Sequence, residues 1–252
     1  QSVTKVTGVP ACAPLTASES PIIPHSTTCF IALSHLDIVP LLSTPLSAEM
    51  GLAQHPSGFA DMHEFQTFVY LPVQKTGSTF ISALLDEFSK EEEVRHEAHT
   101  PMPKDFDPKK FYFISVRDPL DAYLSLYSFG SDARGAMHKK FEKGGKGDLY
   151  DGTMLGFKVW LAHVIKPRNA ADLEHRYATV GDGAIARLLG LQSYRYLRLA
   201  LPPGALATCR TQDDIRKAYA ERKLPRYVIR HETFAADLCA LLRGPLRYAI
   251  RD

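Results

Sequence analysis

The sequence predicts an α/β fold with a central parallel sheet flanked by helices. One apolar, β-prone run passes into an amphipathic helix through a lysine-bearing turn within residues 67–88. A second apolar run, at residues 110–117, ends at an arginine and leads into another helix. Helix and strand patterns then continue to alternate as far as residue 242. Such alternation is typical of a sheet whose parallel strands are covered by helices.

The first strand is predicted at residues 67–73 and its helix at about residues 78–88. The helix prediction depends on apolar residues that recur at helical spacing on one face, namely Phe80, Ile81, Leu84, Leu85 and Phe88. The turn between strand and helix contains Gly77, which allows the backbone to come close to a ligand.

This turn has the composition of an anion-binding site. A helix start leaves its first backbone N–H groups without partners, so an anion placed there gains hydrogen bonds and the positive end of the helix dipole. Lys75 adds a full charge, and Ser78 and Thr79 add hydroxyl donors. In nucleotide triphosphatases the lysine follows the glycines (GxxxxGKS or GxxxxGKT), whereas Lys75 precedes the only glycine of this turn. That order argues against ATP or GTP hydrolysis by the usual route.

A second segment strengthens the prediction of a ligand site. The buried strand predicted at residues 110–117 ends at Arg117, after which Asp118 can cap a helix whose first turn accepts Pro119. Ser125 lies about two helical turns further along. In an open α/β sheet the ligand crevice lies outside the carboxyl ends of the strands, so Arg117 and Ser125 are expected to approach the same ligand.

Together these residues resemble the sulfotransferase family, which transfers a sulfuryl group from 3′-phosphoadenosine 5′-phosphosulfate (PAPS) to a hydroxyl or amine. In that family a PKTGST or PKTGTT turn binds the 5′-phosphosulfate, and an RDPxxxxxS segment holds the 3′-phosphate. This chain has QKTGST at residues 74–79, with glutamine for the usual proline, and RDPLDAYLS at residues 117–125. A third, weaker similarity lies at residues 226–234, where His231 replaces a common tyrosine. The resemblance implies a P-loop-like fold, a 3′ site of Arg117 and Ser125, and a 5′ site of Lys75, Thr76, Gly77, Ser78 and Thr79.

The resemblance also implies roles in catalysis. Sulfuryl transfer requires in-line positioning, neutralisation of charge on the leaving phosphate, and a base for the acceptor proton. By analogy with phosphoryl transfer, we expect Lys75 to stabilise the bridging oxygen. Related enzymes commonly carry a catalytic histidine or glutamate between the two phosphate segments, where this chain has residues 91–100. His99 is our first candidate, because imidazole suits proton abstraction near neutral pH and the next residues, Thr-Pro, favour an extended exit into the cleft. His96 and Glu97 remain alternatives.

No metal is expected in this reaction. Residues 96–100 read His-Glu-Ala-His-Thr, one residue short of the HExxH spacing that places two ligands on one helix face. The four cysteines, Cys12, Cys29, Cys209 and Cys239, lack the close paired spacing of a zinc site.

Two parts of the chain are expected: an extension rich in Pro, Ser and Thr at residues 1–60, and a PAPS-binding domain at residues 61–252. Residues 29–33 of the extension could form a short strand.

No run approaches the ~20 apolar residues of a membrane-spanning helix. A lumenal protein with a Cys12–Cys29 bridge and a reduced cytoplasmic one both fit the cysteines, and the start at Gln1 is compatible with removal of an upstream signal, anchor or tag. Of the two compartments we favour the cytoplasm.

Residues 131–151 are predicted to be a mobile, lysine-rich loop, with a lid or a grip on an acidic glycan as its functional alternative. Further helices are predicted at residues 153–165, 183–191, 213–222 and 233–242, with a strand at residues 227–230. Trp160 is expected in the core rather than in the acceptor site. The net charge of +2 does not indicate a nucleic-acid partner.

The sequence therefore predicts a PAPS-dependent sulfotransferase that acts on a hydroxyl or amine of a carbohydrate or small molecule, with adenosine 3′,5′-bisphosphate as product. A kinase with a variant phosphate loop is the main alternative. A non-catalytic nucleotide- or glycan-binding relative is the third reading.

Overall fold

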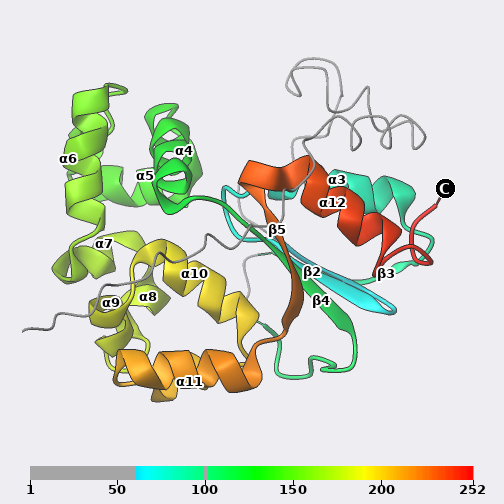
Figure 1. Ribbon diagram of the computed structural model, residues 1–252. Coiled ribbons are helices and arrows are strands. Elements are labelled where there is room, and N and C mark those ends of the chain that lie inside the picture. Colours follow the sequence, from blue (N-terminus) through cyan, green and yellow to red (C-terminus); the bar gives the residue numbers. More distant parts are fainter. Residues whose placement is uncertain (1–60, 99–101, 252) are drawn as a thin grey trace, which may run out of the picture.

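The computed structural model describes residues 61–98 and 102–251, which form a five-stranded sheet with helices on both faces (Figure 1). The strand order is β3-β1-β2-β4-β5. The strands are β1 (Asp61–Phe65), β2 (Phe68–Leu71), β3 (Glu93–Ala98), β4 (Phe111–Val116) and β5 (Pro225–Arg230). Strands β2, β4 and β5 are parallel, and β1 is antiparallel to both β2 and β3. The predicted α/β class is confirmed, with a parallel half that carries the predicted motifs and an antiparallel half that makes the sheet mixed.

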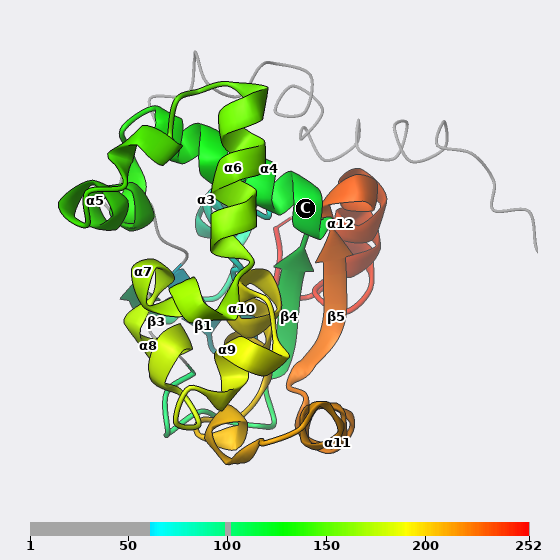
Figure 2. The same cartoon turned by 90° about the vertical axis from the view of Figure 1, so that its left-hand side faces the viewer.

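Alternating side chains on the parallel strands build a core on each face of the sheet. Tyr70 and Phe113 pack with α3 (Ser78–Phe88) and α12 (Phe234–Arg243) on one face. Leu71 and Ile114 pack on the other face against α10 (Leu191–Ala200), next to α11 (Gln212–Arg222). Figures 1 and 2 show the two helix pairs on opposite sides of the sheet.

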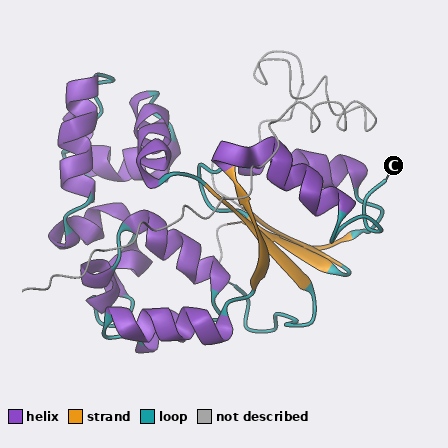
Figure 3. Ribbon diagram, in the orientation of Figure 1, coloured by secondary structure: helices purple, strands orange, loops and turns teal. Residues whose placement is uncertain are grey.

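A separate group of helices follows β4 and stands beside the sheet, as the helix colouring of Figure 3 makes clear. Its members are α4 (Pro119–Ser131), α5 (Gly135–Lys143), α6 (Met154–Val164), α7 (Ala170–Leu173), α8 (His175–Thr179) and α9 (Ala184–Leu188). Their core centres on Trp160, which is 0% exposed. The structure thus places this tryptophan in the core, as predicted.

Several predicted elements are confirmed, one prediction is wrong, and one strand was not predicted. Helix α3 spans the predicted residues, and α6, α9, α11, β5 and α12 match their predicted ranges within a few residues. Residues 131–151 are not a loop, because Met137 and Phe141 are buried on α5, and the 3₁₀ helix η2 (Gly147–Leu149) follows. The segment that carries the candidate bases forms strand β3, which the sequence did not predict and which is held by its backbone pairing with β1.

Within residues 61–98 and 102–251, no helix is long and apolar enough to cross a membrane. The short strand expected at residues 29–33, the Cys12–Cys29 bridge and the N-terminal extension lie outside the described residues. Cys209 and Cys239 are buried and unbridged.

Candidate active site

The lysine-bearing turn lies where β2 ends and α3 begins. Gly77 is the N-cap of α3 and has φ of 86°, a left-handed conformation that favours glycine. Lys75 also has a positive φ, 69°, which is uncommon for a residue with a side chain. Non-glycine residues are held in this region only where the surrounding contacts enforce it, and such positions are frequent at ligand sites. The conformation of the turn is therefore the first structural sign of function.

Thr76 fastens this turn to the sheet. Its hydroxyl donates to the carbonyl oxygen of Val73 at 2.7 Å and shares a hydrogen bond of 2.6 Å with Ser115 Oγ on β4. Ser115 in turn bonds the hydroxyl of Tyr70 on β2 at 2.7 Å. The side chain of Thr76 is buried and directed into the protein, so only its backbone N–H remains for a ligand. Thr79 is exposed on the first turn of α3.

Positive charges converge on Lys75. Burial lowers the pKa of Lys75 below its ordinary value, and the charges of Arg134, Arg117 and Arg195 lower it further. The Nζ atom of Lys75 lies 3.9 Å from the centre of the Phe129 ring, a cation–π contact that holds the ammonium in place. Four cations from different parts of the chain thus surround one region beside the turn, and a bound anion would relieve their mutual repulsion.

Two of these arginines have buried nitrogen atoms without an acceptor among the described residues. They are Arg117 Nε and Arg195 Nη1. Arg195 is only 7% exposed and is held by Glu174, whose Oε1 accepts from Arg195 Nε at 2.6 Å. Buried donors are nearly always satisfied in native proteins, and an unsatisfied one calls for an explanation such as a missing ion. Both atoms have the chemistry to bind phosphate or sulfate oxygens.

The second predicted segment has the expected geometry. Arg117 follows β4 directly, and Asp118 caps α4 by accepting from the N–H of Leu120 at 2.8 Å. The N–H of Asp118 donates to Glu232 Oε1 at 2.6 Å, and this bond lowers the pKa of the Glu232 carboxyl. Glu232 belongs to the third predicted segment, which thereby contacts the second. Ser125 lies on α4, half-buried.

Two cavities border the turn. One, of about 350 Å³, lies between residues 72–74 and helices α4, α5, α8 and α10, and its wall includes Phe129, Arg134 and Arg195. The other, of about 530 Å³, is lined by Thr76 and Arg117 together with apolar and tyrosine side chains of α10 and α11. Because Phe129 belongs to the wall of the first cavity, the ammonium of Lys75 lies beside that cavity. We refer to it below as the arginine cavity.

The three candidates for the base have different positions. His99 lies outside the described residues. The backbone of Glu97 pairs with Met62, and His96 pairs with His63, so both belong to β3. Strand β3 ends at Ala98, which pairs with Asp61 at the start of β1. Because β1 runs antiparallel to both β3 and β2, these two strands end on the same side of the sheet. Strand β3 therefore ends on the side of the sheet where the lysine-bearing turn follows β2.

The contacts of His96 lie elsewhere. Its Nδ1 is 3.6 Å from Glu93 Oε2, and its ring centre is 4.5 Å from that of His63. His96 lines neither of the two cavities described above.

Sequence reasoning missed the arginines that complete the charged region. Arg195 lies in α10 among Leu191, Tyr194 and Leu197, all of them buried. The signal available was an arginine within the apolar stripe of an amphipathic helix, where a charged residue needs a partner. Arg134 and Glu174 have no comparable signal, because both lie at helix boundaries.

An open α/β sheet with a cationic strand-to-helix turn at the carboxyl ends of its strands is typical of proteins that bind a phosphorylated or sulfated ligand. Residues 60–180 match the family model described as the sulfotransferase family. This span contains the turn, β4 with Arg117, and helix α4. We therefore assign residues 60–180 to the sulfotransferase family. Neither the search of curated proteins nor that of solved structures found a match.

Proposed function

We propose that this protein transfers a sulfuryl group from PAPS to a hydroxyl, or an amine, of a carbohydrate or small-molecule acceptor. The observation that carries the proposal is the convergence of Lys75, Arg117, Arg134 and Arg195, two of which hold buried donors without acceptors. A donor with two phosphoryl groups and a sulfuryl group supplies the negative charge that this region lacks.

The donor would be bound at both ends. Its 5′-phosphosulfate would lie on the turn, with backbone N–H groups of Thr76 and Gly77, the hydroxyls of Ser78 and Thr79, and the ammonium of Lys75 as donors. Arg117 and Ser125 would hold the 3′-phosphate. The positive end of α3 favours the same placement, since its first N–H groups point at the turn.

In the transfer step the acceptor oxygen attacks sulfur in line, the bond from sulfur to the bridging oxygen breaks, and the bridging oxygen stays with adenosine 3′,5′-bisphosphate. Lys75 would stabilise the charge that grows on this oxygen. The acceptor proton would pass to His99, with His96 and Glu97 as the alternative bases. Strand β3 ends on the same side of the sheet as β2, which supports a base at or near the end of β3.

The arginine cavity is the best site for the acceptor, because it lies beside the ammonium of Lys75. Its wall carries Arg176, Arg195, Arg198 and Lys140 but only one carboxylate, Glu174. An acceptor with its own negative charge, such as an acidic glycan, fits this wall better than a neutral one.

The test compares adenosine 3′,5′-bisphosphate, AMP and ATP by titration calorimetry. We expect the bisphosphate to bind most tightly, and Arg117→Ala to remove most of its advantage over AMP, since each charge-assisted hydrogen bond is worth ~1.5–3 kcal/mol. Arg247→Ala is the matched control, because Arg247 is exposed and stacks on Tyr248. Equal affinity of the unmodified protein for bisphosphate and AMP would refute the 3′ site. Tighter binding of ATP would favour a kinase, and bisphosphate binding without sulfate transfer would favour a non-catalytic relative.

A further inference from the structure

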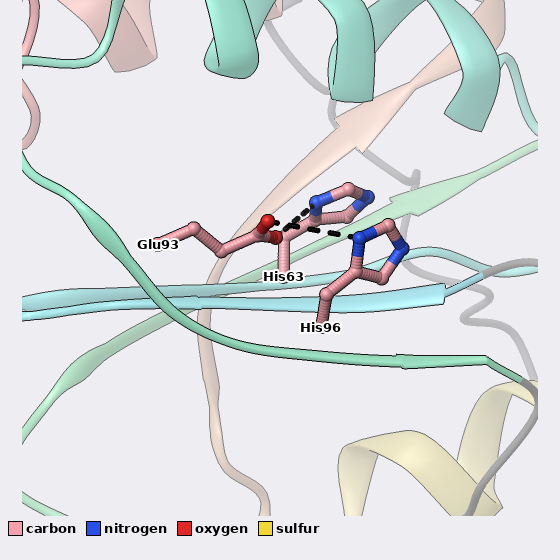
Figure 4. Close-up of side chains that lie close together, drawn as sticks. All are labelled: His63, Glu93 and His96. Atoms are coloured by element: carbon pink, nitrogen blue, oxygen red, sulfur yellow. Dashed lines mark hydrogen bonds and ion pairs between the residues drawn. The ribbon is translucent and has the colours of Figure 1, made fainter.

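His63, Glu93 and His96 form a side-chain cluster that the proposed sulfuryl transfer does not use when His99 is the base. Figure 4 shows both imidazole rings turned toward the carboxylate of Glu93. Nδ1 of His63 lies 2.7 Å from Glu93 Oε1, and Nδ1 of His96 lies 3.6 Å from Glu93 Oε2. One ligand atom from each residue lies within 4.8 Å of the other two. Among the described residues, this is the one group of three or more histidine, cysteine, aspartate and glutamate side chains so close together.

The backbone explains how the cluster forms. His63 on β1 pairs directly with His96 on β3, which places the two rings side by side. In a regular strand, residues 93 and 96 would point to opposite faces, since they are three apart. The register shifts between Glu64 and Phe65, and this irregularity allows Glu93 and His96 to face the same centre. Irregularities of this kind often redirect a side chain at a functional site.

Two imidazoles and one carboxylate are the ligand set of a borderline divalent transition metal. Zn²⁺ accepts this combination and keeps further positions for water, whereas Mg²⁺ and Ca²⁺ prefer oxygen ligands. Ligand atoms around a tetrahedral Zn²⁺ lie about 3.3 Å apart, given bonds of about 2.0–2.1 Å. The observed separations of 2.7 and 3.6 Å lie on either side of that value, and all three ligand atoms lie within 4.8 Å of one another.

The exposure of the three side chains also suits a metal site. His63 is 3% exposed, so the protein holds its ring in place. Glu93 and His96 are partly exposed, which gives an ion a path from solvent.

We propose that His63, Glu93 and His96 form a binding site for Zn²⁺ or a similar divalent transition metal. The ion would join β1 to β3 across the antiparallel half of the sheet. It would also fix the strand that precedes the proposed base, His99, in the sequence. With His99 as the base the site has no part in the transfer step itself, and metal binding can be tested separately from the proposed activity.

The experiment measures Zn²⁺ binding to the full chain by titration calorimetry, with Co²⁺ absorption spectra as a second readout. Glu93→Gln keeps an acceptor for His63 but loses the charged ligand, and His96→Ala removes a partly exposed ring. These changes avoid the buried His63, whose replacement could prevent folding. Far-UV circular dichroism checks that each variant is folded.

His163→Ala is the matched control. His163 Nε2 lies 2.8 Å from Asp172 Oδ2, much as His63 lies from Glu93. The third member of that group is Lys146, whose charged Nζ lies 2.8 Å from the same Asp172 atom and cannot ligate a metal.

We expect the unmodified protein and His163→Ala to bind the same number of Zn²⁺ ions. Glu93→Gln and His96→Ala should each lose one equivalent, or bind it at least about tenfold more weakly, since even outer partners of metal ligands contribute 10–100-fold. The absorption spectrum of bound Co²⁺ should also change in Glu93→Gln and in His96→Ala. Histidines elsewhere in the chain can bind additional ions, so the difference between variants is the decisive quantity. Identical binding by all four proteins, or none by the unmodified protein, would overturn the proposal.

Discussion

Replacement of Thr76 by valine should loosen the candidate active site, because the hydroxyl of Thr76 is hydrogen-bonded within the protein. Valine keeps the branched shape but loses the donor to the Val73 carbonyl at 2.7 Å and the bond to Ser115 at 2.6 Å. A typical intramolecular hydrogen bond contributes about 0.5–1.5 kcal/mol, so the loss of two predicts a fall of about 1–3 kcal/mol in the free energy of unfolding. Ser115 keeps its bond to Tyr70, which favours the lower part of this range.

The assay is urea unfolding followed by circular dichroism and by the fluorescence of Trp160, the only tryptophan of the chain. Thr76→Ser restores both hydrogen bonds and should recover most of the stability. Thr79→Val is the matched control, because Thr79 is exposed, and it should change stability by no more than about 0.5 kcal/mol.

The same substitution should weaken binding of adenosine 3′,5′-bisphosphate, because the bond to Ser115 holds the backbone N–H groups of the turn toward the ligand. Calorimetry measures this effect. If Thr76→Val unfolds at the same urea concentration as the unmodified protein, the hydroxyl does not fasten the turn. If it is destabilised yet binds the bisphosphate unchanged, other contacts set the turn's conformation.

Three further predictions concern single residues. Lys75→Ala should lower turnover much more than bisphosphate affinity, because charge on the bridging oxygen grows only as the transition state forms; unimpaired turnover with a surrogate acceptor would contradict the role. His99→Ala should cut transfer by ~10²–10⁴-fold and leave nucleotide binding intact, whereas an inactive Glu97→Ala beside an active His99→Ala would make the glutamate the base. Burial alone would raise the pKa of Asp237, but its hydrogen bonds with Arg230 outweigh burial and lower that pKa below the ordinary 3.8. A lowered carboxyl pKa stabilises the fold above about pH 4, and the contribution is lost as pH falls through the folded value, so acid should destabilise the unmodified protein more steeply than Asp237→Asn in urea unfolding.

The parallel half of the fold could be predicted because its signals are local. Helix α3 combines an apolar stripe with a glycine at its N-cap, and α4 begins with an Asp-Pro cap. Strands β2 and β4 are short runs of buried apolar residues bounded by turn signals, and each requires only its own few residues for recognition.

The antiparallel half could not be predicted in the same way. Strands β1 and β3 contain charged and histidine residues, and their stability depends on pairing between segments about 30 residues apart. The pattern of residues within one segment does not show with which distant segment it pairs. Helix α5 was missed for a different reason, since its glycines and lysines suggested a loop and outweighed the buried pair Met137 and Phe141.

The candidate site shows the same difference between residues with a local sequence signal and residues brought in by tertiary packing. Lys75 and Arg117 belong to short motifs and could be placed from the sequence, whereas Arg134 and Arg195 reach the site only through the packing of α5 and α10. Burial lowers the pKa of Lys75, and repulsion by arginines gathered from separate elements lowers it further.

The carboxylate of Glu174 offsets only part of this charge, because it is shared between Arg195 and Arg198. The remaining excess favours a ligand with more than one negative charge over a singly charged one, since each added charge interacts with several cations at once. A doubly phosphorylated donor and an acidic acceptor would together neutralise the excess positive charge on both sides of Lys75. The charge balance of the site therefore supports the proposed donor and the proposed acceptor class on the same physical ground.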